Sequence, residues 1–263
     1  MGERGTFRVM LLIVGLVFAF LYIPISVVVG LSFNDGGLPT AWTGFSTRWY
    51  GELLANDDIL HAAGNTLIVA LASTLVSTVL GTLLALGVEL RRRKGHALEA
   101  LIFAPMIIPD IVLAIALLSF FSLLNVTMGL HTITMAHVVF NLAFVCSVVR
   151  AALKTFDWSI VEASADLGAS QITTFFRVVL PVLAPAILAG ALLAFTLSVD
   201  EFIIAFFTSG AGRSSITLPM QIFSMIRFGV TPEINALATI VLSVSVIALT
   251  LSQRLSRRSV IPT

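Results

Sequence analysis

Three carboxylates set in otherwise apolar sequence are the side chains best placed to do chemistry. Asp110 follows Pro109, while Asp200 and Glu201 are adjacent within LAFTLSVDEFIIAFF. No lysine or arginine lies deep in these stretches to pair with them, and an unpaired carboxylate in an apolar medium becomes protonated. The alternatives are a neutral acid, a water-lined cavity or a cationic ligand, and we favour a cavity that receives a cation.

The same carboxylates have a purely structural alternative. An aspartate directly after a proline is a natural cap for a helix that restarts there, and Glu201 would then hydrogen-bond a neighbouring helix. Successive helical residues differ by roughly 100° in direction, so at most one of Asp200 and Glu201 points squarely into a pathway.

Other catalytic patterns are absent from the sequence. The phosphate-binding pattern G-x-x-x-x-G-K-[ST] does not occur, and Ser209–Ser215 (SGAGRSS) only imitates it. The histidines lack H-E-x-x-H or other metal-ligand spacing, and a place in a loop or at an interface is expected for each: His61, His96, His131 and His137. We therefore expect neither catalysis nor a bound cofactor or metal in this chain.

Composition places the chain in a membrane. Hydrophobic residues make up 58% and charged residues 11% of the 263 residues, against roughly 45–50% and 25% in soluble domains. The alternation of a β-barrel is missing, so an all-α bundle is expected. Six segments are each near or above the ~20 residues that cross a bilayer as a helix, and together they form one domain over residues 1–263: Val9–Leu31, Asn65–Leu90, Ala97–Leu124, Ile133–Ala151, Pro181–Thr208 and Asn235–Leu255.

The distribution of lysine and arginine predicts that both termini are cytoplasmic. In that orientation all but three of the 15 basic residues face the cytoplasm, the exceptions being Arg48, Arg213 and Arg227. At ~1.5 Å rise per residue, Asp110 then lies near the middle of the membrane and the Asp200–Glu201 pair in its outer half.

Small residues recur every four positions in the second apolar segment, at Ser73, Ser77, Gly81 and Ala85. This spacing puts them on one helix face, where another helix can approach closely. That helix belongs either to this chain or to a second membrane subunit.

A polar stretch between apolar segments, Thr155–Pro181, keeps a helical pattern and falls on the cytoplasmic side. Ser159 and Glu162 have the spacing of a capping box, which predicts a helix start. Gly168 would end that helix in a left-handed turn, Ser170 would cap a second short helix, and Pro181 would end the second run. We expect this loop to hold a partner protein.

This loop resembles the EAA motif, E-A-A-x3-G-x9-I-x-L-P, of permease subunits of ABC importers. The match has two conservative departures, Ser164 for the second alanine and Val178 for isoleucine. The resemblance implies a type I, MetI-like permease fold with six transmembrane helices, whose loop of residues 155–180 forms a coupling helix in a cleft of a separate ATPase. The residues that would couple to the ATPase are Glu162, Ala163, Ser164, Gly168, Leu180 and Pro181.

Further stretches are similar to the permeases of spermidine/putrescine importers, nearest the PotI/PotC type. They are STRWYGELL, PMIIPDIVL, LAFTLSVDEFIIAFF and TLPMQIFSMIRFGVTPEINALATIVL. This resemblance implies a bacterial inner-membrane assembly with a second permease, two ATPase subunits that hold ATP and Mg, and a periplasmic polyamine-binding protein. A polycationic solute agrees with three membrane-depth acids, and Asp110, Asp200 and Glu201 are the candidates to line its pathway.

The hypothesis is that two ATPase subunits close on each other and move the transmembrane helices through the loop of residues 155–180. The cavity would then open to the two sides of the membrane in turn. The alternatives are an ABC permease for another small solute, a secondary transporter that uses Asp110 and Asp200 as proton carriers, and an intramembrane hydrolase. The last lacks the G-x-S-x-G pattern and paired catalytic histidines.

Overall fold

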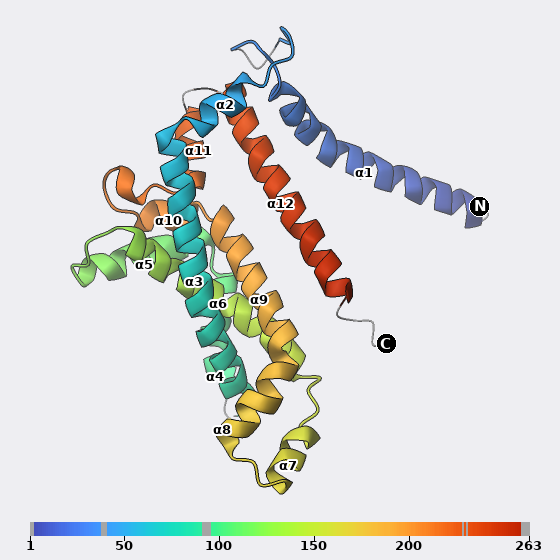
Figure 1. Cartoon of the computed structure of the whole chain (residues 1–263), viewed down its shortest axis with the longest axis vertical. Helices are drawn as coiled ribbons and strands as arrows, with labels where there is room; N and C mark the ends of the chain where they lie inside the picture. The colour runs from blue at the N-terminus through green and yellow to red at the C-terminus, as the bar shows by residue number, and fades with distance from the viewer. Residues whose placement is uncertain (1–2, 38–40, 91–95, 228, 230, 259–263) are drawn as a thin grey trace. The chain divides into compact units, whose positions relative to one another are not determined.

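The computed structural model describes residues 3–37, 41–90, 96–227, 229 and 231–258 (Figure 1). Within these ranges every regular element is helical, and an isolated antiparallel bridge joins Asn34 and Phe45. The predicted all-α fold class is therefore confirmed. The elements in chain order are α1 (Glu3–Leu31), α2 (Arg48–Leu54), α3 (Asp57–Leu90), α4 (His96–Ile107), α5 (Asp110–Leu123), α6 (Leu130–Leu153), α7 (Ser159–Asp166), α8 (Gln171–Thr174), the π-helix η1 (Phe175–Val179), α9 (Leu180–Asp200), α10 (Ile203–Thr208), the 3-10 helix η2 (Arg213–Ser215), α11 (Leu218–Arg227) and α12 (Pro232–Arg258).

The chain divides into two compact units, Met1–Ile59 with Ile222–Thr263 and Leu60–Gln221. In the first unit, α12 packs against both α1 and α2. Asn34, buried in the loop after α1, donates from Nδ2 to the Ala41 carbonyl and accepts at Oδ1 from the Thr43 N–H, both at 2.8 Å. These bonds replace the hydrogen bonds to water that the Asn34 side-chain amide loses when it is buried.

The second unit is built around α6, which α4, α5, α9 and α10 all contact. Towards its C-terminus, Val145 and Val149 are fully buried in a cluster with Leu183 of α9. Towards its N-terminus, Phe140 packs in a cluster with Ile204 of α10. This central helix thus packs against α5 and α9, the helices that carry Asp110 and Asp200.

The predicted face of small residues on α3 meets helices of the same chain, Gly81 against α6 and Ser73 against α9. A Cβ atom at Gly81 would lie 2.8 Å from Val145 Cβ, so only glycine permits this approach. Ser73, Ser77 and Ala85 on that face are fully buried. Of the two alternatives for the facing helix, the one within this chain is the one observed.

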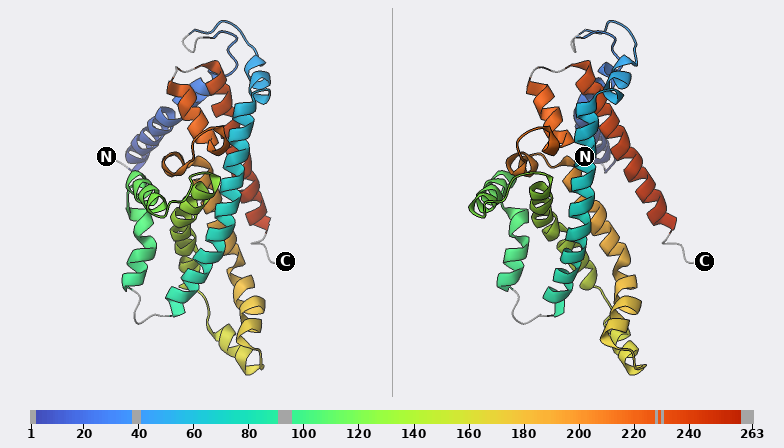
Figure 2. Two further views of the ribbon diagram at one scale, coloured as in Figure 1. Left: turned by 90° about the vertical axis from the view of Figure 1, so that its left-hand side faces the viewer. Right: turned by 60° about the vertical axis from the view of Figure 1, so that its left-hand side comes forward.

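Among the residues that the structure describes, four helical stretches are long and apolar enough to span a membrane, or five if α4 and α5 form one broken span: Phe7–Leu31, Asp57–Leu90, Leu130–Leu153 and Gln171–Asp200. The third predicted segment, Ala97–Leu124, is not one straight helix, because α4 and α5 meet at a bend of 114° (Figure 2). Pro109 lies in the break, where it lacks an N–H and disfavours helical geometry at the preceding residue. The sixth predicted segment falls within α12, whose described apolar stretch is Pro232–Val244.

Candidate functional site

The polar loop after α6 begins with α7, and this helix starts where the sequence predicts, at Ser159. The predicted capping box is wrong, because no side chain caps this helix. Instead, the Ser159 N–H donates to Asp157 Oδ1 at 3.0 Å and the Glu162 N–H donates to the Trp158 carbonyl at 3.3 Å. Asp157, two residues earlier, thus accepts from the Ser159 N–H, which in the capping box would have donated to the Glu162 carboxylate. Hydrogen bonds from the Ser159 side chain and backbone lower the pKa of this exposed carboxyl.

The end of α7 confirms the role predicted for Gly168. Its φ of 82° lies in the left-handed region. The Ala169 N–H donates to the Ser164 carbonyl at 3.1 Å and the Gly168 N–H donates to the Ala165 carbonyl at 2.8 Å. This pair of bonds is a Schellman motif, which needs a residue that tolerates positive φ at this position.

The second half of the loop folds back on the first. Ser170 Oγ accepts from the Thr173 N–H at 3.3 Å and so caps α8, as predicted. Ser164 Oγ and Thr174 Oγ1 lie 2.9 Å apart and join α7 to α8. The loop's inner side is apolar, since Ile160 and Val161 pack on the core cluster that contains Leu153 and Val179.

The outer side of the loop presents large apolar side chains to solvent. Leu167 is 88% exposed, Ile172 71% and Phe176 60%. Glu162 and Ala163 are exposed beside them on α7. Both views of Figure 2 place α7 and α8 at one end of the second unit, remote from α10. The loop is therefore a projecting knuckle with an uncovered apolar surface, as a docking element would have.

Pro181 does not end the helical run, contrary to the prediction. The chain passes from α8 through the π-helix η1 into α9, and the Leu180 N–H donates to the Phe175 carbonyl. A proline cannot donate to the carbonyl four residues earlier and its ring crowds that carbonyl. The extra residue of the π-turn displaces that carbonyl, so Leu180 and Pro181 form the first turn of a continuous span.

The three predicted carboxylates lie at two helix breaks. Asp110 is the first residue of α5, directly after the α4–α5 bend, and its side chain makes no capping hydrogen bond there. Asp200 ends α9 and is exposed. Glu201 occupies the extended break before α10, where Oε1 accepts from the Ile204 N–H at 2.8 Å. The structural alternative therefore fails for Asp110, which caps no helix, while Glu201 bonds α10, the helix that follows it.

Packing of α10 on α5 brings two of these carboxylates together. Asp110 and Glu201 are close enough for their charges to repel each other. Neither α5, α9 nor α10 contains a lysine or arginine that could offset this repulsion. A cation bound between the breaks would relieve it, and the C-terminal end of a helix such as α9 carries negative partial charge that also favours a cation.

Sequence reasoning missed a buried polar cluster at the centre of the second unit. His137, expected in a loop or at an interface, is fully buried in α6, and its Nδ1 lies 2.7 Å from Ser198 Oγ of α9. Ser198 Oγ also lies 3.1 Å from Ser73 Oγ of α3. The signal was available, since His137 and Asn141 share one helix face at four-residue spacing, as do Ser73 and Ser77.

Comparison with known proteins agrees with this arrangement. Residues 77–262 match the family described as "Binding-protein-dependent transport system inner membrane component". The chain is 43% identical over 247 residues to the putrescine transport system permease protein PotI of Escherichia coli (strain K12), covering 91% of this chain and 86% of PotI. It is 40% identical over 242 residues to the spermidine/putrescine transport system permease protein PotC of the same strain, covering 92% and 91%.

A solved structure shows the same fold at low sequence identity. The crystal structure of the bacterial alginate ABC transporter in complex with an alginate pentasaccharide-bound periplasmic protein matches with a TM-score of 0.76 at 18% identity, covering 97% of this chain and 96% of that one. The predicted resemblance and permease fold are thus confirmed. The chain belongs to the family of binding-protein-dependent transport system inner membrane components.

Proposed function

We propose that this chain is a permease subunit of an ATP-driven polyamine importer and forms half of its translocation pathway. The observation that carries the proposal is the pair of carboxylates, Asp110 and Glu201, which stand at two helix breaks on the packed helices α5 and α10 without a basic residue in α5, α9 or α10. Putrescine and spermidine are polycations, and they are the solutes named for relatives at 43% and 40% identity. Broken spans with polar groups at the break are a common way for membrane transporters to build a binding site.

The orientation follows the basic residues, with both termini cytoplasmic in a bacterial inner membrane. The knuckle formed by α7 and α8 would then face the cytoplasm, and the break at Asp200 and Glu201 would lie in the outer half. Residues 1–263 would act as one permease domain beside a second, different permease. Two ATPase subunits would hold ATP and Mg, and a periplasmic binding protein would deliver the solute.

Coupling would run through the knuckle. Exposed Glu162 and Ala163, with Leu167, Ile172 and Phe176, give an ATPase cleft an apolar surface with a charged edge. The Schellman turn at Gly168 and the Ser164–Thr174 contact hold α7 at a fixed angle to α8. Because α8, η1 and α9 are continuous, a push on the knuckle would reach Asp200 along one span. The energy must come from ATP binding to one ATPase arrangement over another, since a contact equal in both states shifts nothing.

Uptake by proteoliposomes tests the proposal. The chain is reconstituted with its co-purifying subunits, and labelled putrescine or spermidine is supplied with the binding protein, with ATP inside. We expect uptake that requires ATP and survives collapse of the proton gradient. Uptake that follows the proton gradient without an ATPase would identify a secondary transporter. ATP-dependent uptake of another solute, with polyamines neither transported nor competing, would leave an ABC permease with a different substrate.

A further inference from the structure

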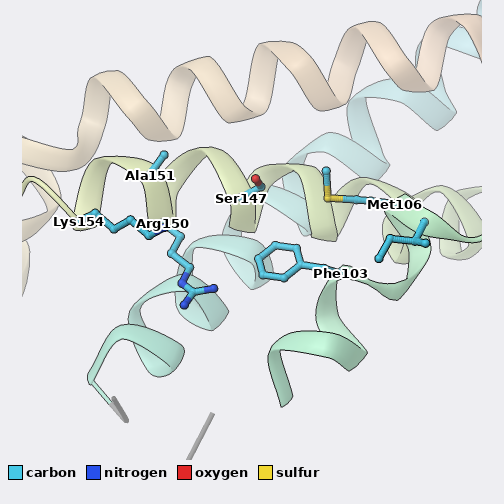
Figure 3. A pocket seen from close by; sticks show the side chains of 7 residues that line it. Phe103, Met106, Ser147, Arg150, Ala151 and Lys154 are labelled. Atoms are coloured by element: carbon cyan, nitrogen blue, oxygen red, sulfur yellow. The ribbon is translucent and has the colours of Figure 1, made fainter. Parts of the chain in front are cut away.

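A groove between α4 and α6 lies outside the site described above. It has a volume of about 420 Å³ and is lined by Phe103, Met106, Ile107, Ser147, Arg150, Ala151 and Lys154. Figure 3 shows its side chains arranged along its length, with Lys154 and Arg150 towards one end, Phe103 between, and Met106 towards the other. The groove therefore changes from cationic to apolar over its length.

The cationic end is held in place by neighbouring groups. Arg150 Nη2 donates to Glu99, and the guanidinium carbon lies 5.9 Å from the centre of the Phe103 ring. Its Nε is buried without a hydrogen-bond partner among the residues that the structure describes. Lys154 is exposed and has no ion-pair partner in that part of the chain, so the groove keeps an uncompensated positive charge.

The order of the lining residues matches the depth profile of a phospholipid leaflet. Lys154 caps the end of α6 that precedes the knuckle, which is the cytoplasmic end in the proposed orientation. Ser147 lies two turns, roughly 10 Å, further along the same helix. On the deeper side Ile107 is 81% exposed and Met106 41% exposed. A headgroup phosphate would thus meet Lys154 and Arg150 while an acyl chain lies on Met106 and Ile107.

We propose that this groove binds an anionic phospholipid of the cytoplasmic leaflet, with the phosphate at Lys154 and Arg150 and an acyl chain along α4. Basic pockets between membrane helices on the cytoplasmic side suit such headgroups. The volume falls within the roughly 300–1,000 Å³ typical of ligand sites. The two cationic side chains also disfavour the alternative that the groove is a route for a polycation, an argument that rests on the proposed function. The lipid would brace α4 against α6 beside the knuckle.

Lipid retention is the direct measurement. The tagged chain, purified with the subunits that accompany it, is placed in nanodiscs of mixed phosphatidylglycerol and phosphatidylcholine and released for native mass spectrometry. The wild type should retain phosphatidylglycerol in preference. Lys154→Gln should lower that preference about fivefold, the effect expected for one basic residue near the headgroups. Lys154→Arg, which keeps the charge, is the matched control and should retain it.

Two further arms identify the occupant. Met106→Trp fills the deeper groove without changing charge, and it should reduce retention although Lys154 and Arg150 remain. Inorganic phosphate should not displace the lipid, since it lacks the chain. A photoreactive benzoylphenylalanine in place of Ile107 should cross-link to lipid.

Three outcomes would overturn the proposal: equal retention of both lipids by the wild type, displacement by inorganic phosphate, or cross-linking of position 107 to another protein subunit. None depends on transport, so these results are independent of the polyamine assignment.

Discussion

Ser164 Oγ lies 2.9 Å from Thr174 Oγ1, and this contact joins the two short helices of the knuckle. Ser164 stands where the EAA motif has its second alanine, so this chain adds a hydrogen bond where the motif has only a methyl group. Thr174 is buried, which leaves its hydroxyl dependent on this partner. Serine in place of alanine at position 164 thus adds a hydrogen bond that stabilises the packing of α7 on α8.

A double-mutant cycle measures that contribution. Ser164→Ala alone leaves the buried Thr174 hydroxyl unpaired, and we expect it to destabilise the knuckle by about 1–3 kcal/mol. Thr174→Val removes the need for the bond, so Ser164→Ala should cost less in that background than alone. Hydrogen exchange of the α7 and α8 amides gives the four values. Additive effects of the two changes would show that the contact contributes nothing.

Gly168→Val tests the left-handed turn. No atom lies within 4 Å of a Cβ built at Gly168, so any effect is conformational and not steric. A β-branched residue at φ 82° costs about 1–2 kcal/mol or more, and the α7–α8 angle should relax to avoid it. We expect normal membrane insertion with loss of transport-stimulated ATPase activity. Gly168→Asn, which tolerates positive φ, is the control, and normal stimulation in the valine variant would refute the coupling role.

Local signals in the sequence predicted much of the knuckle. Gly168 and Ser170 act through bonds to residues at most five positions away, so their roles follow from spacing alone. The capping box failed because Asp157, another local acceptor, competes for the same N–H. The π-turn before Pro181 was not predictable, because the spacing of Ile172, Phe175 and Phe176 fits an α-helix equally well.

The neighbours of the polar residues within the apolar segments are determined by long-range packing, which the sequence does not show. The residue types marked Asp110 and Glu201 as unusual, but only the docking of α10 on α5 brings them together. The same holds for His137, whose Ser198 partner comes from a different helix. Polar residues inside apolar segments were therefore recognisable as candidates, while their partners required the fold.

Asp200→Asn tests the pathway assignment. Asp200 is exposed at the end of α9 with no hydrogen bond or ion pair in the described part of the chain, so the change should leave folding and assembly intact. Loss of one charge contact to a polycation should lower uptake at low spermidine concentration by about tenfold, the equivalent of about 1.4 kcal/mol. Asp57→Asn, an exposed acid at the start of α3, is the control. Unchanged uptake by Asp200→Asn would remove this residue from the pathway.

Glu201 has two roles that different substitutions separate. Glu201→Gln keeps an oxygen that can accept from the Ile204 N–H but removes the charge, so we expect weaker polyamine uptake with nearly unchanged stability. Glu201→Ala removes both, and it should also lower stability by about 0.5–2 kcal/mol, as loss of a helix-capping side chain does. Uptake as a function of spermidine concentration, together with unfolding in detergent, distinguishes the two. Equal transport by wild type and Glu201→Gln would leave Glu201 a structural cap only.

Ser198→Ala tests whether the buried polar cluster holds the bundle together. His137 Nδ1 and Ser73 Oγ both lie within hydrogen-bond distance of Ser198 Oγ, and the imidazole is fully buried. Removing the hydroxyl leaves His137 Nδ1 without its partner. Nε2 of the same ring already has none among the described residues, so both ring nitrogens would then be buried and unpaired. We expect a loss of about 1–3 kcal/mol in the free energy of unfolding, measured by denaturant titration in detergent. Thr196→Ala, two residues earlier on an exposed face of α9, removes a hydroxyl bonded only to its own helix and should cost much less. Equal losses in the two variants would mean that the contacts between α3, α6 and α9 do not depend on this cluster.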